Sequence, residues 1–327
     1  MNTLFLHVGP HKTGTTLIQK FCLDNQAELF KSNLVYPKRY LKIFGHHGFR
    51  ERLQNQSLSK EDLDFFQENH DFLLSSEDFI SLHKNSFEYL RNTIKSKNIV
   101  VLFAWRRASF KLFSIWQETV KHGATESFYS YYHNHLARPA QSQMLSADLK
   151  LDTLCRVFGK QNVKVLDYDA SNSNDSLLAD FVGALGLEWS ESFVMADNNP
   201  NAVNRSMDIA DIEVIRALNH IFAKQDGRTG SWLREQYAKH QVILNELGLN
   251  ELKAIISANL NELVVGNYFI DNRCERIMTE RYQSNILNYK AMSEPKKIQL
   301  ANDNWVFDIQ AQAILNKMTD VLRKVAI

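Results

Sequence analysis

Four short runs rich in apolar residues recur through the first half of the chain, each of the length of a buried strand. They cover residues 3–8, 71–74, 98–105 and 162–168. Stretches with helical spacing of apolar residues lie between them, such as residues 15–34 and the region after Leu177. Strands that alternate with helices predict βαβ units and a mostly parallel sheet with helices on both faces. The sequence therefore predicts an α/β fold.

From residue 209 onward the pattern changes to helical spacing with no strong strand. We expect helices over residues 209–223, 232–246, 249–260, 277–289 and 309–325. On this basis residues 1–208 are expected to form the α/β core. Residues 209–327 are expected to form a helical C-terminal part that packs with the core as one structural unit.

Polar clusters follow the predicted strands at residues 9–16, 75–77, 106–114 and 167–173. In open parallel sheets, ligands bind at the carboxyl ends of the strands. We therefore expect these clusters to meet at one edge of the sheet and to form the functional site.

The composition narrows the class of protein. The 327 residues carry a formal charge of +1, which is unlike a nucleic-acid-binding protein. The 44% hydrophobic content suits a packed core, and the three cysteines form no CxxC pair. No apolar run reaches the roughly 18 residues of a membrane helix, and no basic segment of a signal peptide precedes the first apolar run. We expect a cytoplasmic protein with no integral membrane segment and no nucleic-acid partner; the sequence does not specify the oligomeric state.

The cluster Gly-Pro-His-Lys-Thr-Gly-Thr-Thr, at residues 9–16, stands between a predicted strand and a predicted helix. In this setting, loop amides and a helix N-terminus bind phosphate oxygens. The nucleoside-triphosphatase form of the loop has Lys directly after its second Gly. Here Thr15 occupies that position, and the lysine is Lys12, inside the loop. The sequence predicts a phosphate loop of a different kind.

The segment KTGTT after an apolar strand resembles the 5′-phosphosulfate loop of the sulfotransferases that use 3′-phosphoadenylyl sulfate (PAPS). In that family a second strand ends in an Arg, and a Ser eight residues later joins it in binding the 3′-phosphate. Here Arg106 ends the apolar run of residues 98–105, and Ser114 is eight residues further on. Two motifs in the right order and in the right context identify the chain as resembling this family.

Weaker similarities to bacterial carbohydrate-type members extend over most of the chain. They lie at residues 73–79, 116–123, 163–170, 203–206 and 280–285. The glycine-rich RKG segment of the cytosolic members, which adds contacts to the 3′-phosphate, is absent.

The resemblance implies a P-loop NTPase-like, three-layer α/β/α fold and transfer of a sulfuryl group from PAPS (EC 2.8.2.-), with 3′,5′-adenosine bisphosphate (PAP) as product. Lys12 would be catalytic, because it stabilises the bridging oxygen that gains negative charge. No metal is required in this assignment, since Lys12 and the helix dipole supply positive charge. The implied nucleotide-binding residues are His11, Lys12, Thr13, Gly14, Thr15, Thr16, Arg106 and Ser114.

A base must take the proton of the attacking acceptor. Glu77 is the expected catalytic base, because it follows a buried strand at the predicted ligand edge and the family uses Glu or His for this step. The histidines at positions 7, 11, 46 and 47 are its rivals, and Glu77 could instead be a charge at a helix N-terminus. From the resemblance we expect a small-molecule or glycan acceptor, a carbohydrate or glycoconjugate that offers a hydroxyl or an amine, although the residues alone do not distinguish a sugar hydroxyl, a lipid headgroup, a phenol or an amine. Residues 209–327 would complete its cleft.

Two other functions compete with this interpretation. A small-molecule P-loop kinase is the alternative enzyme, and the displaced Lys12 argues against it. A catalytically inactive nucleotide-binding module that binds a partner would not need Lys12, Thr15, Arg106 and Ser114 together. Two neighbouring residues are interpreted as structural: Arg107 as a solvated residue, and Trp116 as a core residue rather than a platform for base stacking.

Overall fold

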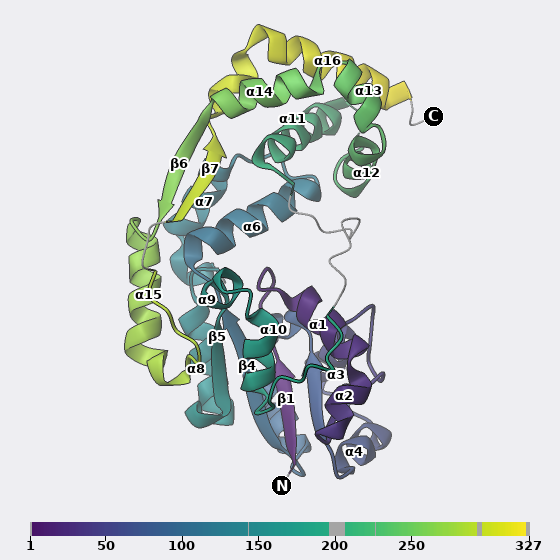
Figure 1. Ribbon diagram of the computed structural model, residues 1–327, viewed down its shortest axis with the longest axis vertical. Coiled ribbons are helices and arrows are strands. Elements are labelled where there is room, and N and C mark those ends of the chain that lie inside the picture. Colours follow the sequence, from purple (N-terminus) through teal and green to yellow (C-terminus); the bar gives the residue numbers. More distant parts are fainter. Residues whose placement is uncertain (1, 143, 196–206, 226, 293–295, 325–327) are drawn as a thin grey trace. The chain divides into compact units, whose positions relative to one another are not determined.

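The structure is a computed structural model that describes residues 2–142, 144–195, 207–225, 227–292 and 296–324 (Figure 1). The chain divides into two compact units. The sheet unit consists of Met1–Arg107, Gln143–Asn198 and Arg273–Met292, and the helical unit of Ala108–Ser142, Asn199–Asn272 and Ser293–Ile327. Both units are discontinuous in sequence and therefore do not follow the expected boundary between residues 208 and 209. The similarity at residues 203–206 lies outside the described residues.

Five parallel strands form the sheet of the sheet unit, in the order β2-β3-β1-β4-β5. The central strand β1 lies between β3 and β4, with Leu6 in register with Leu74 and Val101. The four predicted strands are confirmed. Only β2 was missed, because two residues are too short to give a pattern. The strands are β1 (Thr3–His7), β2 (Leu34–Val35), β3 (Asp71–Ser75), β4 (Asn98–Trp105) and β5 (Val163–Asp167).

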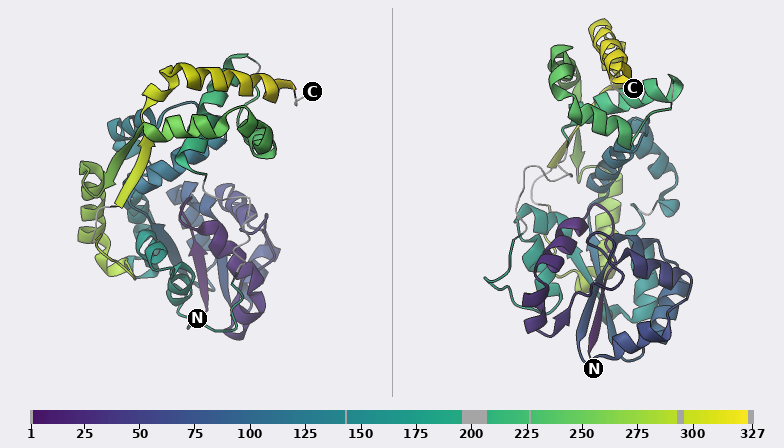
Figure 2. Two further views of the ribbon diagram at one scale, coloured as in Figure 1. Left: turned by 45° about the horizontal axis from the view of Figure 1, so that its top comes forward. Right: turned by 90° about the vertical axis from the view of Figure 1, so that its right-hand side faces the viewer.

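Alternate residues of each strand face opposite sides of the sheet, which gives the sheet unit two cores. In β1, Leu4 and Leu6 join one core, whereas Phe5 joins the other. The core with Phe5 is covered by α1 (Thr15–Asp24), α2 (Gln26–Lys31) and α10 (Leu177–Ala184). The core with Leu4 is covered by α3 (His47–Gln54), α4 (Lys60–Gln67), α5 (Lys84–Thr93), α8 (Ala147–Phe158) and α15 (Phe269–Tyr282). Helices on both sides of the sheet, visible in Figure 2, confirm the expected three-layer α/β/α fold.

The helix expected over residues 15–34 is divided into α1 and α2 at Asn25. The Asn25 side chain donates a hydrogen bond of 2.9 Å to the carbonyl oxygen of Phe21. Such a bond satisfies a carbonyl at the end of α1 and lets the chain turn.

The polar cluster of residues 167–173 forms the short helix α9 (Tyr168–Ser173), and the Asp167 side chain caps the N-terminus of this helix.

Seven described helices make up most of the helical unit. Trp116 of α6 is fully buried, which confirms its interpretation as a core residue. None of the described helices in either unit is long and apolar enough to cross a membrane. The seven are α6 (Ala108–Lys121), α7 (Phe128–Ala137), α11 (Ile209–Gln225), α12 (Ser231–Lys239), α13 (Gln241–Glu246), α14 (Leu249–Ala258) and α16 (Ile309–Lys324).

The expectation that the C-terminal part lacks strands was wrong. β6 (Leu260–Val265) and β7 (Lys296–Ala301) pair as an antiparallel ribbon, with Leu263 opposite Ile298. β6 follows α14 after a single residue, so its apolar side chains extend the helical pattern in the sequence. Pairing with a strand about thirty residues away leaves no local signal.

Two expected helices in this region also differ in their limits. Residues 232–246 form two helices, α12 and α13, with a break at His240. The helix expected over residues 277–289 is α15, which begins at Phe269 and ends at Tyr282. Element boundaries depend on caps and packing that apolar spacing does not reveal. The remaining elements are short 3-10 helices at Glu77–Ser81 (η1), Pro139–Gln141, Lys160–Asn162, Gln283–Asn285 and Asp303–Phe307.

Candidate functional site

The predicted phosphate loop connects the carboxyl end of the central strand β1 to the N-terminus of α1. Gly9 (φ +76°) and Gly14 (φ +73°) adopt the left-handed conformation, and so does Lys12 (φ +64°). A left-handed residue with a side chain costs roughly 1–2 kcal/mol, so Lys12 needs support from its surroundings. A Cβ on Gly9 would lie 2.9 Å from Cα of Glu77. Gly9 therefore lets the loop approach the chain that follows β3.

The hydroxyls of the loop have different environments. Thr13 is fully buried and donates a hydrogen bond of 2.6 Å to the carbonyl oxygen of Pro10, so its side chain is used within the loop. Thr15 is buried at the first position of α1, whereas Thr16 is exposed. The N-terminus of α1 carries the positive end of the helix dipole and unpaired amides, which suit an anion.

Arg106 follows β4 and contacts the loop directly. Its Nη1 donates a hydrogen bond of 2.8 Å to the carbonyl oxygen of Lys12. Its Nε lies 3.6 Å from Oδ1 of Asp169, and its guanidinium carbon is 5.0 Å from the centre of the Tyr168 ring. The structure thus brings Arg106 together with the loop, as the sequence predicts for two parts of one site. Ser114 lies on α6, in the helical unit.

Arg107 is not the solvated residue that we expected. Its side chain is only 3% exposed and pairs with Asp167 at 2.8 Å and with Glu275 at 3.2 Å. It also donates to the carbonyl oxygen of Lys290 and lies over the Trp105 ring. Burial disfavours its charge, but the Asp167 carboxylate and its neighbours outweigh this effect and raise the pKa of Arg107. The expectation failed because no local pattern distinguishes a buried arginine from an exposed one.

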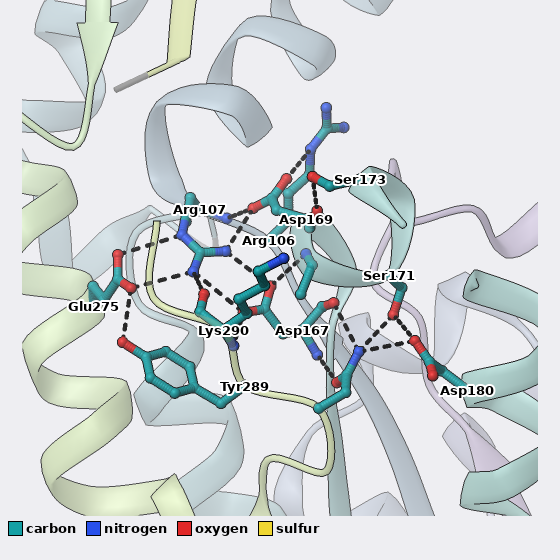
Figure 3. Close-up of polar contacts among 12 residues, drawn as sticks. Arg106, Arg107, Asp167, Asp169, Ser171, Ser173, Asp180, Glu275, Tyr289 and Lys290 are labelled. Atoms are coloured by element: carbon teal, nitrogen blue, oxygen red, sulfur yellow. Dashed lines mark hydrogen bonds and ion pairs between the residues drawn. The ribbon is translucent and has the colours of Figure 1, made fainter. Parts of the chain in front are cut away.

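Asp169 of α9 lies between the two arginines, as Figure 3 shows. Its Oδ2 accepts a hydrogen bond of 2.7 Å from the backbone amide of Arg107. Burial raises the pKa of the Asp169 carboxyl group, which the Arg107 amide and both guanidinium charges oppose. The sequence pointed to the polar cluster at residues 167–173 but not to this residue.

Glu77 is the first residue of η1 and lies beside the loop. Its Oε2 accepts a hydrogen bond of 2.6 Å from Nε2 of Gln19, a buried side chain on α1. The carboxylate is partly exposed. Glu77 is therefore fixed in orientation, next to Gly9, at the edge of the sheet where the loop lies.

Asp78 is a functional candidate that the sequence analysis missed. One carboxylate oxygen lies 2.9 Å from Nδ1 of His47 and the other 3.4 Å from Nε2 of His11. The Ser76 hydroxyl also lies 2.9 Å from Nδ1 of His47. In the sequence, only its position directly after Glu77 could have marked Asp78 as a candidate. Its two histidine partners come from distant segments, so the sequence does not show the pairing.

The other two histidines are buried. His7 is fully buried, with Nδ1 2.7 Å from the Ser75 hydroxyl, and burial lowers its pKa to about 3. His46 is fully buried between the carbonyl oxygen of Pro37 and the amide of Ser75, and burial lowers its pKa to about 4. Both therefore stay neutral near pH 7. Among the four histidine rivals of Glu77, only His11 and His47 are in contact with solvent.

The arrangement has two chemical halves. Lys12, Arg106 and the amides at the start of α1 supply positive charge and hydrogen-bond donors for an anion. Glu77 and the Asp78–His47 pair supply proton acceptors close to the same loop. The described residues contain no group of three or more His, Cys, Asp or Glu side chains arranged to hold a metal ion.

Neither a protein-family model nor a curated protein sequence matches this chain. Among solved structures, the chain is similar to a sulfotransferase from Alicyclobacillus acidocaldarius, with 18% identity and a TM-score of 0.37. The matched region covers 67% of this chain and 96% of that protein.

Proposed function

We propose that this protein is a PAPS-dependent sulfotransferase that transfers a sulfuryl group to a hydroxyl or an amine of an acceptor by in-line displacement. One observation carries the proposal. The loop at the end of the central strand holds its lysine inside the loop, at Lys12, and Arg106 from the next strand bonds the carbonyl oxygen of that lysine. Two segments that the sequence linked separately to one nucleotide are thus in contact.

The residues of the loop suit the phosphosulfate end of the donor. The loop amides with Thr15 and Thr16 would hold the 5′-phosphate, and the His11, Thr13 and Gly14 backbone would shape the loop around it. Arg106, whose side chain is 18% exposed, would bind the 3′-phosphate together with Ser114. Arginine suits this role, because charge-assisted hydrogen bonds to phosphate are strong and directional.

Each catalytic role follows from charge that develops during transfer. PAPS supplies an activated sulfuryl group whose departure leaves negative charge on the nucleotide. The ammonium group of Lys12 would stabilise that charge, and the dipole of α1 would add to it. Glu77, which Gln19 holds in orientation, would take the proton from the attacking acceptor. We propose a carbohydrate or glycoconjugate as acceptor, because the weaker sequence similarities are to carbohydrate-type members.

A kinase is the competing enzyme, and the position of Lys12 separates the two functions. A P-loop kinase places Lys directly after the second Gly of its loop to reach the β- and γ-phosphates, together with bound magnesium. In this chain that position is Thr15, the first residue of α1. The loop lysine is therefore suited to contact a group that is shorter and less charged than a triphosphate.

The proposal is tested by incubating the full chain with PAPS and a panel of sugar, lipid-headgroup, phenol and amine acceptors and measuring released PAP. We expect acceptor-dependent PAP release that EDTA leaves largely intact. Parallel reactions with ATP and magnesium should give no ADP above background. Magnesium-dependent ADP release would instead support the kinase. Tight PAP binding with no turnover on any acceptor class would support the inactive nucleotide-binding module.

A further inference from the structure

We propose that Asp169 is a positioning residue that acts on Lys12 through Arg106. This inference rests on the proposed function, in which Lys12 is the cation of the transition state. It concerns a relationship that the loop motif does not contain, because Asp169 lies more than 150 residues from the loop.

Lys12 is supported by Arg106. Its backbone is left-handed, a conformation that an L-residue adopts only when its surroundings hold it there. The hydrogen bond from Nη1 of Arg106 ends on the carbonyl oxygen of this same residue. Fixing that carbonyl fixes the peptide plane after Lys12 and so the direction in which its side chain leaves the loop.

Arg106 is in turn supported by Asp169. Among the described residues, its buried Nε has no hydrogen-bond partner. A compensating charge lies at Oδ1 of Asp169, 3.6 Å away, and the guanidinium carbon lies over the Tyr168 ring. A buried N–H of a charged group is costly without a compensating charge. Asp169 is therefore what keeps Arg106 in the orientation that reaches Lys12.

Asp169 is held in place by Arg107. Its second oxygen accepts from the backbone amide of Arg107, and the Arg107 side chain is held by Asp167 and Glu275 (Figure 3). A continuous set of polar contacts thus runs from the buried Arg107 through Asp169 and Arg106 to Lys12. Glu275 belongs to the same network but is paired with Arg107 rather than with Arg106.

This difference between the two carboxylates gives a matched pair of variants. Asp169→Asn keeps an acceptor for the Arg107 amide but removes the negative charge that lies beside Arg106 and, at 3.5 Å, beside the Arg107 guanidinium. Glu275→Gln removes one negative charge from the same network and leaves the pair between Arg106 and Asp169 in place. Hydrogen exchange of the amides at residues 9–16, in the chain without nucleotide, reports the loop independently of any activity.

We expect Asp169→Asn to speed exchange in residues 9–16 about threefold or more. It should also lower kcat for PAPS about tenfold, because a displaced Lys12 meets the bridging oxygen poorly. Glu275→Gln should change both quantities much less, because Asp167 still holds the Arg107 side chain. In a Lys12→Ala background, Asp169→Asn should lower kcat little further, because its effect passes through Lys12.

The proposal is overturned if Asp169→Asn has the loop hydrogen exchange and the kcat of the wild-type chain. It is also overturned if Glu275→Gln changes both quantities as much as Asp169→Asn does. Additive losses of kcat in the double variant would also overturn it. If Asp169→Asn does not fold, Arg106→Lys serves instead: it keeps the charge but loses the guanidinium donors, and unchanged loop exchange in it would contradict the proposal. A wild-type chain that fails to turn over PAPS removes the proposed function, whereas the exchange measurement still decides the role of Asp169.

Discussion

Nε2 of Gln19 donates a hydrogen bond of 2.6 Å to Oε2 of Glu77, which joins the first helix after the loop to the turn after β3. Gln19 is buried on α1, so it has few alternative positions and holds the carboxylate in one direction. The structure therefore provides an oriented carboxylate beside the loop.

We predict that Glu77→Gln lowers turnover with PAPS by on the order of 10²-fold, because the amide cannot take the acceptor proton. PAP affinity and thermal stability should change little. The measurement is kcat from PAP release, with calorimetry of PAP binding as the control for folding. His11→Asn and His47→Asn should each reduce kcat far less.

The opposite pattern would change the assignment. If His47→Asn abolishes turnover while Glu77→Gln stays active, the base is the His47–Asp78 pair. In that pair the carboxylate would hold Nδ1 as the protonated nitrogen and leave Nε2 as the acceptor. Glu77 would then be a charge at the start of η1 that contributes roughly 0.3–1 kcal/mol to stability.

Lys12→Ala should lose turnover much more than PAP affinity. The contact of the ammonium group strengthens only as the bridging oxygen gains charge, so its loss raises the barrier rather than weakening the product complex. Steady-state kcat and the Kd for PAP, measured on the same preparation, separate the two effects. Turnover within a few-fold of the wild-type value would show that Lys12 is not the transition-state cation.

Arg106 should determine the preference for a 3′-phosphate. We expect the wild-type chain to bind PAP more tightly than ADP by roughly 1.5–3 kcal/mol, the contribution of a charge-assisted hydrogen bond. Arg106→Ala should remove most of this difference in calorimetric titrations. Arg276→Ala is the control, because its side chain is 70% exposed on α15 and it removes the same charge. Equal affinity of the wild-type chain for PAP and ADP would contradict the assignment.

The buried histidines should make the protein less stable in acid. The pKa values of His7 and His46 are lowered to about 3 and about 4 by burial, so the unfolded chain binds more protons than the folded chain below about pH 6.5. The contribution of the two neutral histidines to stability is therefore fully present above this pH. It falls as the pH drops toward the folded-state pKa values, by roughly 2–3 kcal/mol for each histidine at pH 4.5.

The measurement is urea unfolding at pH 7.5 and pH 4.5. His7→Asn, which can still bond Ser75, should show a smaller difference between the two pH values than the wild-type chain. His83→Asn changes an exposed ring and should show the wild-type difference. An unchanged difference in His7→Asn would mean that His7 is not held neutral in the folded chain.

Gly9→Ala should be more damaging than Gly186→Ala, although both residues have a similar positive φ. A Cβ on Gly9 would lie 2.9 Å from Cα of Glu77, whereas a Cβ on Gly186 meets nothing within 4 Å. Gly186→Ala should therefore show only the cost of the left-handed conformation, roughly 1–2 kcal/mol. Gly9→Ala should lose more stability in thermal unfolding and should also lower turnover, because the backbone of Glu77 must move. Equal losses in the two variants would indicate that the close approach is unimportant.

The sequence by itself determined the layers of the sheet unit. Apolar runs such as residues 98–105 are long, β-rich and bounded by polar residues, so hydrophobic burial alone dictates strands there. The loop was also visible, since a glycine at each end and a lysine between them are local features. What the apolar pattern could not show was the β6–β7 ribbon, whose strands are stabilised by partners distant in sequence.

Tertiary structure alone decided how the polar residues pair. Arg106 and Arg107 are neighbours in the sequence, yet one bonds the loop and the other is buried between Asp167 and Glu275. Asp78 gains its two histidine partners in the same way: His11 comes from the loop after β1, the strand beside β3, and His47 comes from α3. The reason is physical: apolar burial follows a periodicity that the sequence records, whereas the partner of a buried charge is set by whichever carboxylate folding brings within a few ångströms.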